Sequence, residues 1–219
     1  MGMVYMSNKN NKGLFIVLEG GDGTGKSTQA KLIKEYIETE YSKEVVLTRE
    51  PGGVDTAEMI REIILNQEID AITEALLFAS ARREHLVKKV IPALKENKIV
   101  ICDRFLYSSL AYQGYARKIG IENVYNINLY AIEDCFPDLT IMLDLNAKDG
   151  IDRILNNRTD EINRLDKEGL DFHSNVREGY KIVSQIYNDE LFKVDASKNI
   201  EGVFEQIKPI IDHVMQNKK

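Results

Sequence analysis

Cysteine is scarce in this chain, which has 219 residues but only two cysteines, Cys102 and Cys135. They form no CxxC pair and have no neighbouring histidine, so we expect two reduced thiols in the cytosol rather than a disulfide framework or a zinc site. No apolar run approaches the roughly 18 residues of a membrane span, and the first residues lack the pattern of a secretory signal. The sequence therefore predicts a cytoplasmic protein without a membrane partner.

An excess of positive charge is also missing, because 29 Lys and Arg stand against 35 Asp and Glu, for a net charge of −6. General nucleic-acid binders carry a basic surface, so we expect no nucleic-acid partner, although a local basic pocket could still hold phosphates. The hydrophobic fraction of 43% is ordinary for a soluble globular protein. The length fits one compact domain, with or without a mobile lid.

Short apolar runs alternate with helical patterns along the chain. The runs with strand character are Leu14–Glu19, Glu44–Thr48, Lys98–Cys102, Leu139–Leu145 and Leu191–Asp195. The helical patterns cover Lys26–Tyr41, Thr56–Lys95 (two helices), Arg104–Phe136, Lys148–Asn188 and Asn199–Gln216. Several runs are almost continuously Val, Ile and Leu, as expected of parallel strands covered on both faces. The pattern predicts an α/β fold of three layers, a five-stranded parallel sheet flanked by helices.

Two segments do not fit this core. Residues 1–12 are predicted to be a flexible leader, and 13–219 a single domain. Asn156–Asn175 is the least apolar long segment, and its length and charge suggest a mobile flap rather than core. We place this lid at about residues 153–175. The alternative is a charged, solvated connection between helices.

A phosphate-binding motif follows the first predicted strand and opens a helix. Gly20 to Ser27 fits G-x-x-x-x-G-K-[ST], whose glycines let backbone N–H groups surround phosphates. In this P-loop, Lys26 is expected to reach the β- and γ-phosphates, and Ser27 to ligate Mg²⁺. The residues predicted to bind the phosphates of ATP are Gly20, Gly21, Asp22, Gly23, Thr24, Gly25, Lys26, Ser27 and Thr28.

The motif alone does not select a function, because GTPases, motor ATPases and small-metabolite kinases share it. The chain lacks the N-K-x-D segment that reads guanine, and it is short for a motor ATPase. A kinase of a small acceptor is therefore favoured. A kinase of another nucleoside monophosphate and a non-catalytic nucleotide-binding regulator remain alternatives.

Two clusters at predicted strand ends suggest a second phosphate site. Arg49 and Glu50 follow the second strand, and Asp103 and Arg104 follow the third. In a parallel sheet these ends face the ligand crevice. Asp103 is suited to supporting Mg²⁺, and Arg104 to clamping an acceptor phosphate with two N–H groups. The alternatives are a surface turn for the first cluster, and a helix N-cap with a surface arginine for the second.

Two helical segments carry pairs with a spacing of four, so each pair shares a helical face. Phe78 and Arg82 offer an aromatic ring and a guanidinium that would suit a nucleobase. Ser109 and Gln113, with Tyr112 adjacent, could hydrogen-bond a pyrimidine edge. A core phenylalanine with a solvated arginine, and an exposed polar stripe, are the alternatives.

The segments EGGDGTGKST, TREPGG, LLFASARREH, DRFLYSSLAYQGYAR and NRLD occur in this order across essentially the whole chain. Together they resemble the bacterial thymidylate kinase family, as does Arg82 to Arg104. The resemblance implies a P-loop kinase that converts dTMP to dTDP with ATP and Mg²⁺, usually as a homodimer. Selectivity against dUMP stays open.

The resemblance also implies roles for single residues. Phe78 would stack on thymine, Arg82 would contact its carbonyl, and Ser109 and Gln113 would read the base edge. Asp22 would approach the sugar 3′-hydroxyl, and Tyr112 would lie near the sugar. The full set predicted to bind dTMP is Asp22, Arg49, Glu50, Pro51, Arg61, Phe78, Arg82, Arg104, Ser109, Tyr112 and Gln113.

Lys26 is the only cation of the phosphate loop, and Gly23 stands where one subgroup of the family has a basic residue. The resemblance is to the other subgroup, which supplies an arginine from the lid. Arg153, Arg158 and Arg164 lie around and within the predicted flap. The residues predicted to be catalytic are Lys26, Asp103, Arg104, Arg158 and Arg164, with Ser27 and Asp103 as metal ligands. The expected reaction is in-line transfer governed by positioning and charge neutralisation.

Overall fold

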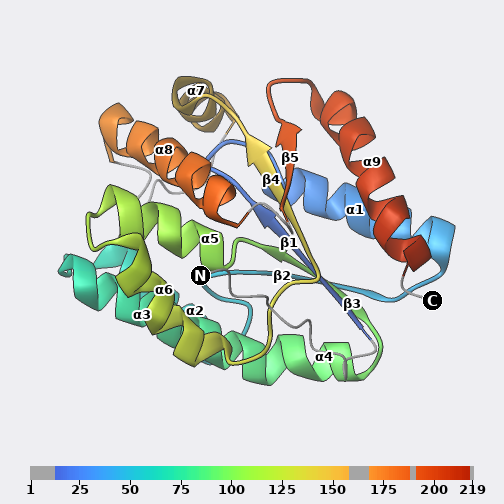
Figure 1. The fold of residues 1–219 in the computed structure, drawn as a ribbon, viewed down its shortest axis with the longest axis horizontal. Coiled ribbons are helices and arrows are strands. Elements are labelled where there is room, and N and C mark those ends of the chain that lie inside the picture. The colour runs from blue at the N-terminus through green and yellow to red at the C-terminus, as the bar shows by residue number, and fades with distance from the viewer. Residues whose placement is uncertain (1–12, 158–167, 188–190, 218–219) are drawn as a thin grey trace.

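Five parallel strands form the centre of the molecule (Figure 1), in a computed structural model that describes residues 13–157, 168–187 and 191–217. The sheet order is β2-β3-β1-β4-β5, so β1 lies in the middle. The strands are β1 (Leu14–Glu19), β2 (Val45–Arg49), β3 (Ile99–Asp103), β4 (Leu139–Asp144) and β5 (Leu191–Asp195). Each predicted strand is confirmed with ends that agree within two residues. The predicted leader, residues 1–12, lies outside the described residues.

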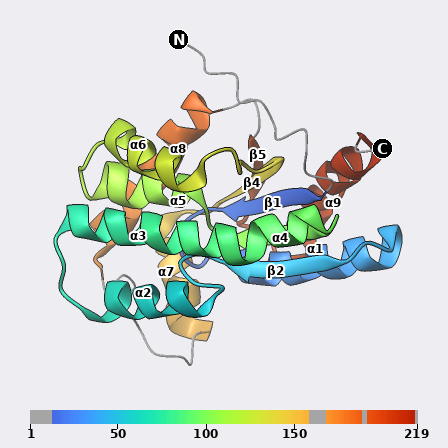
Figure 2. The same ribbon diagram turned by 90° about the horizontal axis from the view of Figure 1, so that it is seen from below.

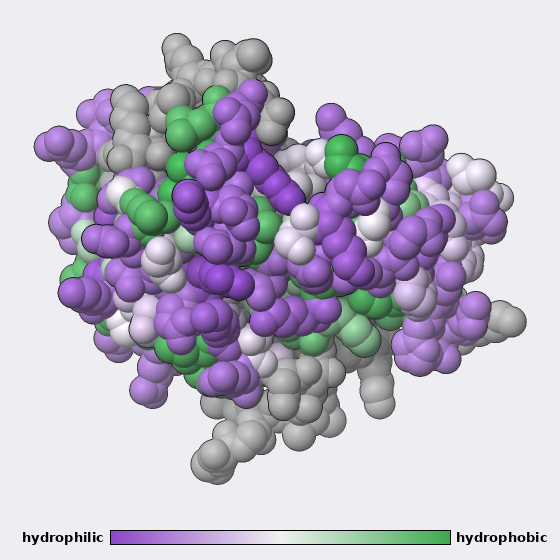
Figure 3. Space-filling model, turned by 90° about the horizontal axis from the view of Figure 1, so that it is seen from above, coloured by the Kyte–Doolittle hydropathy of each residue, from purple (hydrophilic) through white to green (hydrophobic). Residues whose placement is uncertain are grey.

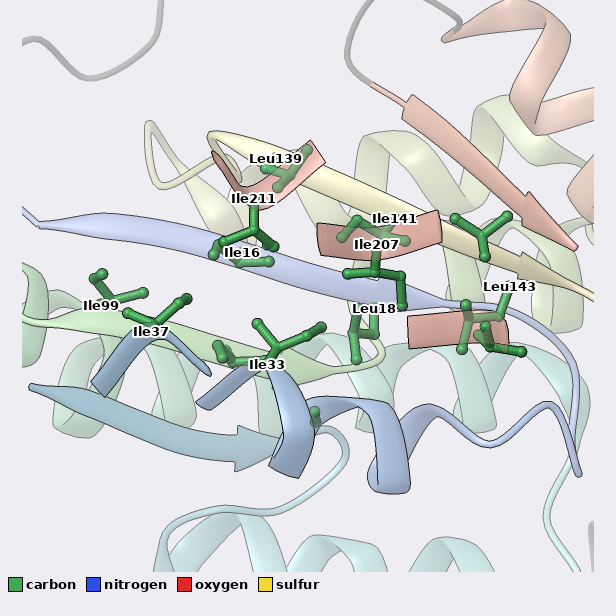
Figure 4. Close-up of a cluster of buried hydrophobic side chains, with 14 of the residues drawn as sticks. Ile16, Leu18, Ile33, Ile37, Ile99, Leu139, Ile141, Leu143, Ile207 and Ile211 are labelled. Carbon is green, nitrogen blue, oxygen red and sulfur yellow. The ribbon is translucent and has the colours of Figure 1, made fainter. Parts of the chain in front are cut away.

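Alternate residues of the strands face opposite sides of the sheet. Leu14, Ile16 and Leu18 of β1 pack against helices α1 (Lys26–Tyr41) and α9 (Ile200–Asn217). Figure 4 shows Ile33 and Ile37 of α1, and Ile207 and Ile211 of α9, gathered against this face. All of these side chains are buried, and their burial is the main favourable contribution to folding here.

Phe15 and Val17 of the same strand enter the core on the opposite face. That core is covered by η1 (Leu86–Val90), α4 (Ile91–Lys95), α5 (Leu106–Ser109), η2 (Leu110–Ala116) and α6 (Ile121–Ile132). Helices on both faces complete the three predicted layers, and the α/β fold is confirmed.

The predicted helical segments differ in detail from the structure. The region Thr56–Lys95 contains α2 (Asp55–Asn66) and α3 (Ala71–His85), and α3 continues through the π-helical turn η1 into α4. Figure 2 shows α2 lying beside α3. The segment after β3 likewise has a π-helical part, η2, which carries Tyr112 and Gln113. Such wider turns often lie at functional sites.

The predicted flap is a helical region at both of its described ends. Helix α7 (Ala147–Asn157) includes its first residues, and α8 (Leu170–Ile186) its last ones. His173 of α8 is buried, so the last part of the predicted flap includes a side chain that packs inside the protein. Residues 158–167, with Arg158 and Arg164, lie outside the described residues, and mobility of the lid stays a prediction.

None of the helices in the described part of the chain has the length and apolarity that crossing a bilayer requires. Seen from above, the described surface is mainly hydrophilic, with hydrophobic residues in small separate groups (Figure 3).

Candidate active site

The candidate site lies at the carboxyl ends of β1, β2 and β3, where an open α/β sheet binds ligands. Two cavities meet there. We call the first the acceptor pocket; it encloses about 660 Å³, part of which is open to solvent. The second, the open groove, runs along the phosphate loop to the start of α9. Asp22, Glu50, Arg61 and Arg104 line both, so the two cavities share one wall.

The phosphate loop closes around its own lysine. Lys26 Nζ donates to the carbonyl oxygens of Gly20 at 3.1 Å and Gly21 at 2.8 Å, and to Thr24 Oγ1 at 3.3 Å. Burial, followed by the nearby charge of Arg104, lowers the pKa of Lys26 to about 8. A partly desolvated ammonium group of this kind is suited to pairing with phosphate oxygens.

Gly23 has a structural reason to be glycine. Its φ is +73°, and a Cβ at this position would lie 2.1 Å from the carbonyl oxygen of Gly150 in α7. A basic side chain at position 23 would therefore displace α7 from the loop. The sequence reasoning interpreted Gly23 as a missing charge, and the structure adds that the loop closely approaches Gly150 in α7, a residue that precedes the predicted lid.

Ser27 and Asp103 are brought together from α1 and the end of β3. Ser27 Oγ donates to Asp103 Oδ2 at 2.6 Å. Both side chains line or border the open groove beside Lys26. Hydroxyl and carboxylate oxygens are the ligands that Mg²⁺ prefers, so this pair fits the metal predicted from the sequence.

Arg104 occupies the wall between the two cavities. Its Nη2 donates to Asp22 Oδ1 at 2.5 Å and to the Tyr112 hydroxyl at 3.2 Å. The Tyr112 hydroxyl donates in turn to Asp22 Oδ2 at 2.6 Å. Burial by itself raises the pKa of Asp22, but the positive charges of Arg104 and Lys26 outweigh it and lower that pKa to about 2. The predicted residues Asp22, Arg104 and Tyr112 thus form one charged cluster.

Arg104 is also held by a second set of hydrogen bonds, which the sequence reasoning missed. Its Nη1 donates to Gly20 O at 3.1 Å, to Ser108 Oγ at 3.3 Å and to the Tyr180 hydroxyl at 3.4 Å. Both hydroxyls contact Glu19, which is fully buried at the end of β1. Burial raises the pKa of Glu19, while the Ser108 hydroxyl and the charge of Arg104 favour its ionised form.

Arg82 is almost completely buried, so the alternative of a solvated arginine is wrong. Its Nε donates to Glu50 Oε2 at 2.7 Å, its Nη1 to Asn128 Oδ1 and its Nη2 to Ser109 Oγ at 3.2 Å. Asn128 of α6 carried no signal in the sequence, because it lies 46 positions from Arg82. A guanidinium fixed on all three nitrogens can present its remaining N–H groups to a ligand in a defined direction.

The other predicted base-binding residues surround the same pocket. Phe78 is half-buried, and Ser109 and Gln113 are buried; all three line the acceptor pocket. Gln113 Nε2 donates to Glu74 Oε1 at 2.9 Å, which orients its amide. Ser109 and Gln113 therefore form no exposed polar stripe, and that alternative is also wrong.

The cluster after β2 divides into buried and exposed parts. Glu50 is buried and bonds to Arg82 and to His85 Nδ1 at 3.0 Å, and it lines both cavities. Pro51 lines the acceptor pocket, and its carbonyl accepts from Arg61 Nη1 at 3.1 Å. Arg49 is more exposed, pairs with Glu58 at 2.9 Å and lines the open groove rather than the acceptor pocket. Arg49 thus lines the open groove together with Arg61 and Arg104, but unlike these two arginines it does not line the acceptor pocket.

The far end of the open groove was not predicted. Lys198, Asn199 and Ile200 line it between β5 and α9, opposite Arg153 of α7. These residues extend the lining of the groove beyond the phosphate loop. The turn between a strand and a helix has no motif here, which explains why sequence reasoning missed it.

Comparisons with known proteins point to one family. The family model described as thymidylate kinase matches residues 18–207. A thymidylate kinase of Clostridium novyi (strain NT) is 51% identical over 201 residues, which cover 90% of this chain and 98% of that protein. One of Geobacillus sp. (strain WCH70) is 50% identical over 207 residues, covering 93% and 98%.

A solved structure agrees with these relatives. The crystal structure of thymidylate kinase from Ehrlichia chaffeensis superposes with a TM-score of 0.73 at 33% identity, covering 91% of this chain and 98% of that one. With this P-loop fold, the two cavities and the relatives in agreement, the chain belongs to the thymidylate kinase family.

Proposed function

We propose that this enzyme transfers the γ-phosphoryl group of ATP to dTMP, with ATP in the open groove and dTMP in the acceptor pocket. The main observation behind this proposal is that Arg104 and Asp22 line both cavities. Phosphates entering from the two sides would meet at Arg104 and beside Lys26. A kinase needs this convergence, whereas a nucleotide-binding regulator needs one cavity alone.

The phosphate loop is the proposed binding site for the donor. Backbone N–H groups of Gly20 to Thr28 would surround the phosphates, and Lys26 would neutralise them. Lys198 to Ile200 and Arg153 would flank the rest of ATP at the other end of the groove. Ser27 and Asp103 would hold Mg²⁺, which supplies charge stabilisation to the phosphate oxygens when it is bound.

The acceptor pocket would orient dTMP by its base, sugar and phosphate. Phe78 would stack on thymine, while Arg82, Ser109 and Gln113 would contact its polar edge. Tyr112 and Asp22 would lie at the sugar, and Arg61 and Arg104 at the phosphate, with Glu50 and Pro51 supporting the wall. Arg49, at the groove side, would approach the phosphate only from the donor direction.

Chemistry at this site requires positioning more than acid–base catalysis. A phosphate monoester is largely ionised at neutral pH, so its oxygen can attack in line without a strong general base. Lys26 and Arg104 would hold donor and acceptor together and offset the charge that builds up during transfer.

A lid arginine is the remaining part of the proposal, and it rests on the sequence alone. Arg158 and Arg164 lie outside the described residues. We expect Arg158→Ala or Arg164→Ala to lower kcat by about a hundredfold or more while KM for dTMP changes little. Unchanged turnover in both variants would contradict the lid proposal.

A homodimer is also proposed, from the family and from exposed side chains on two packed helices. Ile72 and Leu76 are one turn apart on α3, and Tyr130 projects from α6 beside it. Exposed apolar residues on adjacent helices suit a symmetric interface. A monomer at all concentrations in sedimentation would exclude it.

An assay that couples ADP release to a colour change tests the proposed reaction with dTMP, dUMP, dCMP and shikimate as acceptors. We expect turnover with dTMP to exceed that with dCMP and shikimate, because the pocket offers donors and acceptors for a pyrimidine carbonyl edge. Activity with another acceptor but none with dTMP would overturn the proposal. Tight ATP binding without transfer to any acceptor would instead favour the regulator.

A further inference from the structure

Glu19 is a buried acid that the proposed mechanism does not use. It ends β1, directly before the phosphate loop, and its side chain has no exposure to solvent. Its Oε1 accepts from the backbone N–H of Phe105 at 3.0 Å. Its Oε2 accepts from Ser108 Oγ at 2.5 Å and from the Tyr180 hydroxyl at 3.1 Å. Burying a carboxylate costs hydration free energy, so the burial of Glu19 requires an explanation.

All three partners of Glu19 adjoin Arg104. Phe105 follows it in the chain, and Ser108 Oγ and the Tyr180 hydroxyl both accept from its Nη1. The backbone of Arg104 has a φ of +72°, which is unusual for a residue with a side chain. Its N–H donates to Leu18 O at 2.9 Å, so the end of β1 holds this backbone turn at two successive N–H groups.

We propose that Glu19 is a positioning residue that fixes the backbone and the guanidinium of Arg104 for binding the acceptor phosphate. This inference rests on the proposed function of the site, because it assigns Arg104 to that phosphate. Glu19 itself lines neither the acceptor pocket nor the open groove, the two cavities that Arg104 lines.

The direction of the hydroxyl protons explains why an acid is needed. Ser108 and Tyr180 each have one O–H group, and a carboxylate at Oε2 can only accept. Their protons therefore point toward Glu19 or toward each other, at 2.7 Å, and their lone pairs are left facing Arg104 Nη1. Glu19 in this way turns two hydroxyls into acceptors for the guanidinium.

Glutamine at this position has the same shape but cannot satisfy all the partners. If its oxygen faces the Phe105 N–H, its NH₂ group donates to both hydroxyls. One hydroxyl proton is then directed at the guanidinium N–H groups, where no acceptor exists. If the amide is reversed, its NH₂ group opposes the Phe105 N–H. In both arrangements a contact that holds Arg104 is lost.

The test compares the affinities for dTMP and thymidine, measured by calorimetry with wild type and Glu19→Gln at alkaline pH, which favours the ionised form of Glu19. Thymidine lacks the phosphate that Arg104 would bind. We expect Glu19→Gln to weaken dTMP binding about tenfold or more, and thymidine binding by less than about twofold. A purely structural role would weaken both ligands equally, and that result would overturn the inference.

Asp138→Asn is the matched control. Asp138 Oδ2 accepts from the backbone N–H of Phe15 at 2.7 Å, near the opposite end of the same strand. Its loss also removes a carboxylate that holds a backbone N–H, but away from Arg104. We expect it to lower the unfolding temperature while leaving the ratio of the two affinities within about twofold of wild type. A changed ratio in this control would contradict the assignment to Glu19.

Two milder variants keep the inference testable if Glu19→Gln does not fold. Tyr180→Phe and Ser108→Ala each remove one hydroxyl between Glu19 and Arg104. Together they should weaken dTMP selectively, by about tenfold. No selective effect in the double variant would overturn the inference. Wild type that binds neither ligand would instead refute the proposed function.

Discussion

The donor and acceptor halves of this site are built in different ways. The phosphate loop is one run of nine residues, from Gly20 to Thr28, and Lys26 makes its hydrogen bonds inside that run. The acceptor pocket collects side chains from α2, α3, η2 and the ends of β2 and β3. Its polar groups are joined by buried contacts over long sequence separations, such as Arg82 with Glu50 and Asn128.

The two halves should therefore respond differently to mutation. The donor half depends on local backbone conformation, so a side-chain change there should alter charge without disturbing the pocket. The acceptor half depends on a connected network, so removing one buried partner should misplace another. Asp22 and Arg104 belong to both halves.

Removal of the loop cation should have the largest effect. We expect Lys26→Met to lower kcat by about a thousandfold or more, because the variant removes the cation that the phosphate loop itself supplies to the phosphates. The affinity for dTMP should change less than about threefold, since Lys26 lines the open groove and not the acceptor pocket. Steady-state kinetics and dTMP calorimetry would check both values.

The same variant should not be less stable than wild type. Burial lowers the pKa of Lys26 from 10.5 to about 8, so the charged form is less favourable in the folded chain than in the unfolded one. The destabilisation is fully present below about pH 8 and disappears as the pH rises toward the unfolded value. A lower unfolding temperature for Lys26→Met at neutral pH would argue that its hydrogen bonds outweigh this effect.

Loss of one hydrogen-bond partner in the acceptor pocket should have a smaller effect, and only on dTMP. We expect Asn128→Ala to raise KM for dTMP about tenfold, because the guanidinium of Arg82 loses a buried acceptor. KM for ATP should stay within about twofold, as Asn128 does not line the open groove. Equal increases in both constants would show that the two halves are not separable.

For Asp22, which both halves share, the predicted effect is on stability. Its pKa is lowered from 3.8 to about 2, because the charges of Arg104 and Lys26 outweigh the cost of burial. The ionised carboxylate therefore stabilises the fold by about 2 kcal/mol at pH values above the unfolded-state pKa. This contribution is lost as the pH falls through about 2. Denaturant unfolding should find Asp22→Asn less stable than wild type at neutral pH, with the difference shrinking below about pH 4. A constant difference would exclude the ion pair as its cause.

The same contrast explains what the sequence could predict. A motif of consecutive residues, such as Gly20 to Ser27, has a conformation set largely by those residues, so its place between β1 and α1 followed directly. Alternation of apolar runs gave all five strands for a similar reason. Phe78 and Gln113 could be identified only through resemblance, because spacing alone does not say which face of a helix meets a cavity.

Residues that act through others were missed altogether. Glu19, Asn128 and Tyr180 are single polar residues in apolar or helical contexts, and nothing local distinguishes them from surface residues. Their contacts span 46 to 161 positions, as between Asn128 and Arg82 or Tyr180 and Glu19. Only the folded arrangement shows that they lie around Arg82 and Arg104.

A crystal structure with dTMP and ADP bound together would test the central claim most directly, since it reports where each phosphate lies. The account predicts the base of dTMP against Phe78, its phosphate on Arg104, and the phosphates of ADP on the N–H groups of the loop around Lys26. A dTMP phosphate away from Arg104, or an adenine ring in the pocket of Phe78, would contradict it.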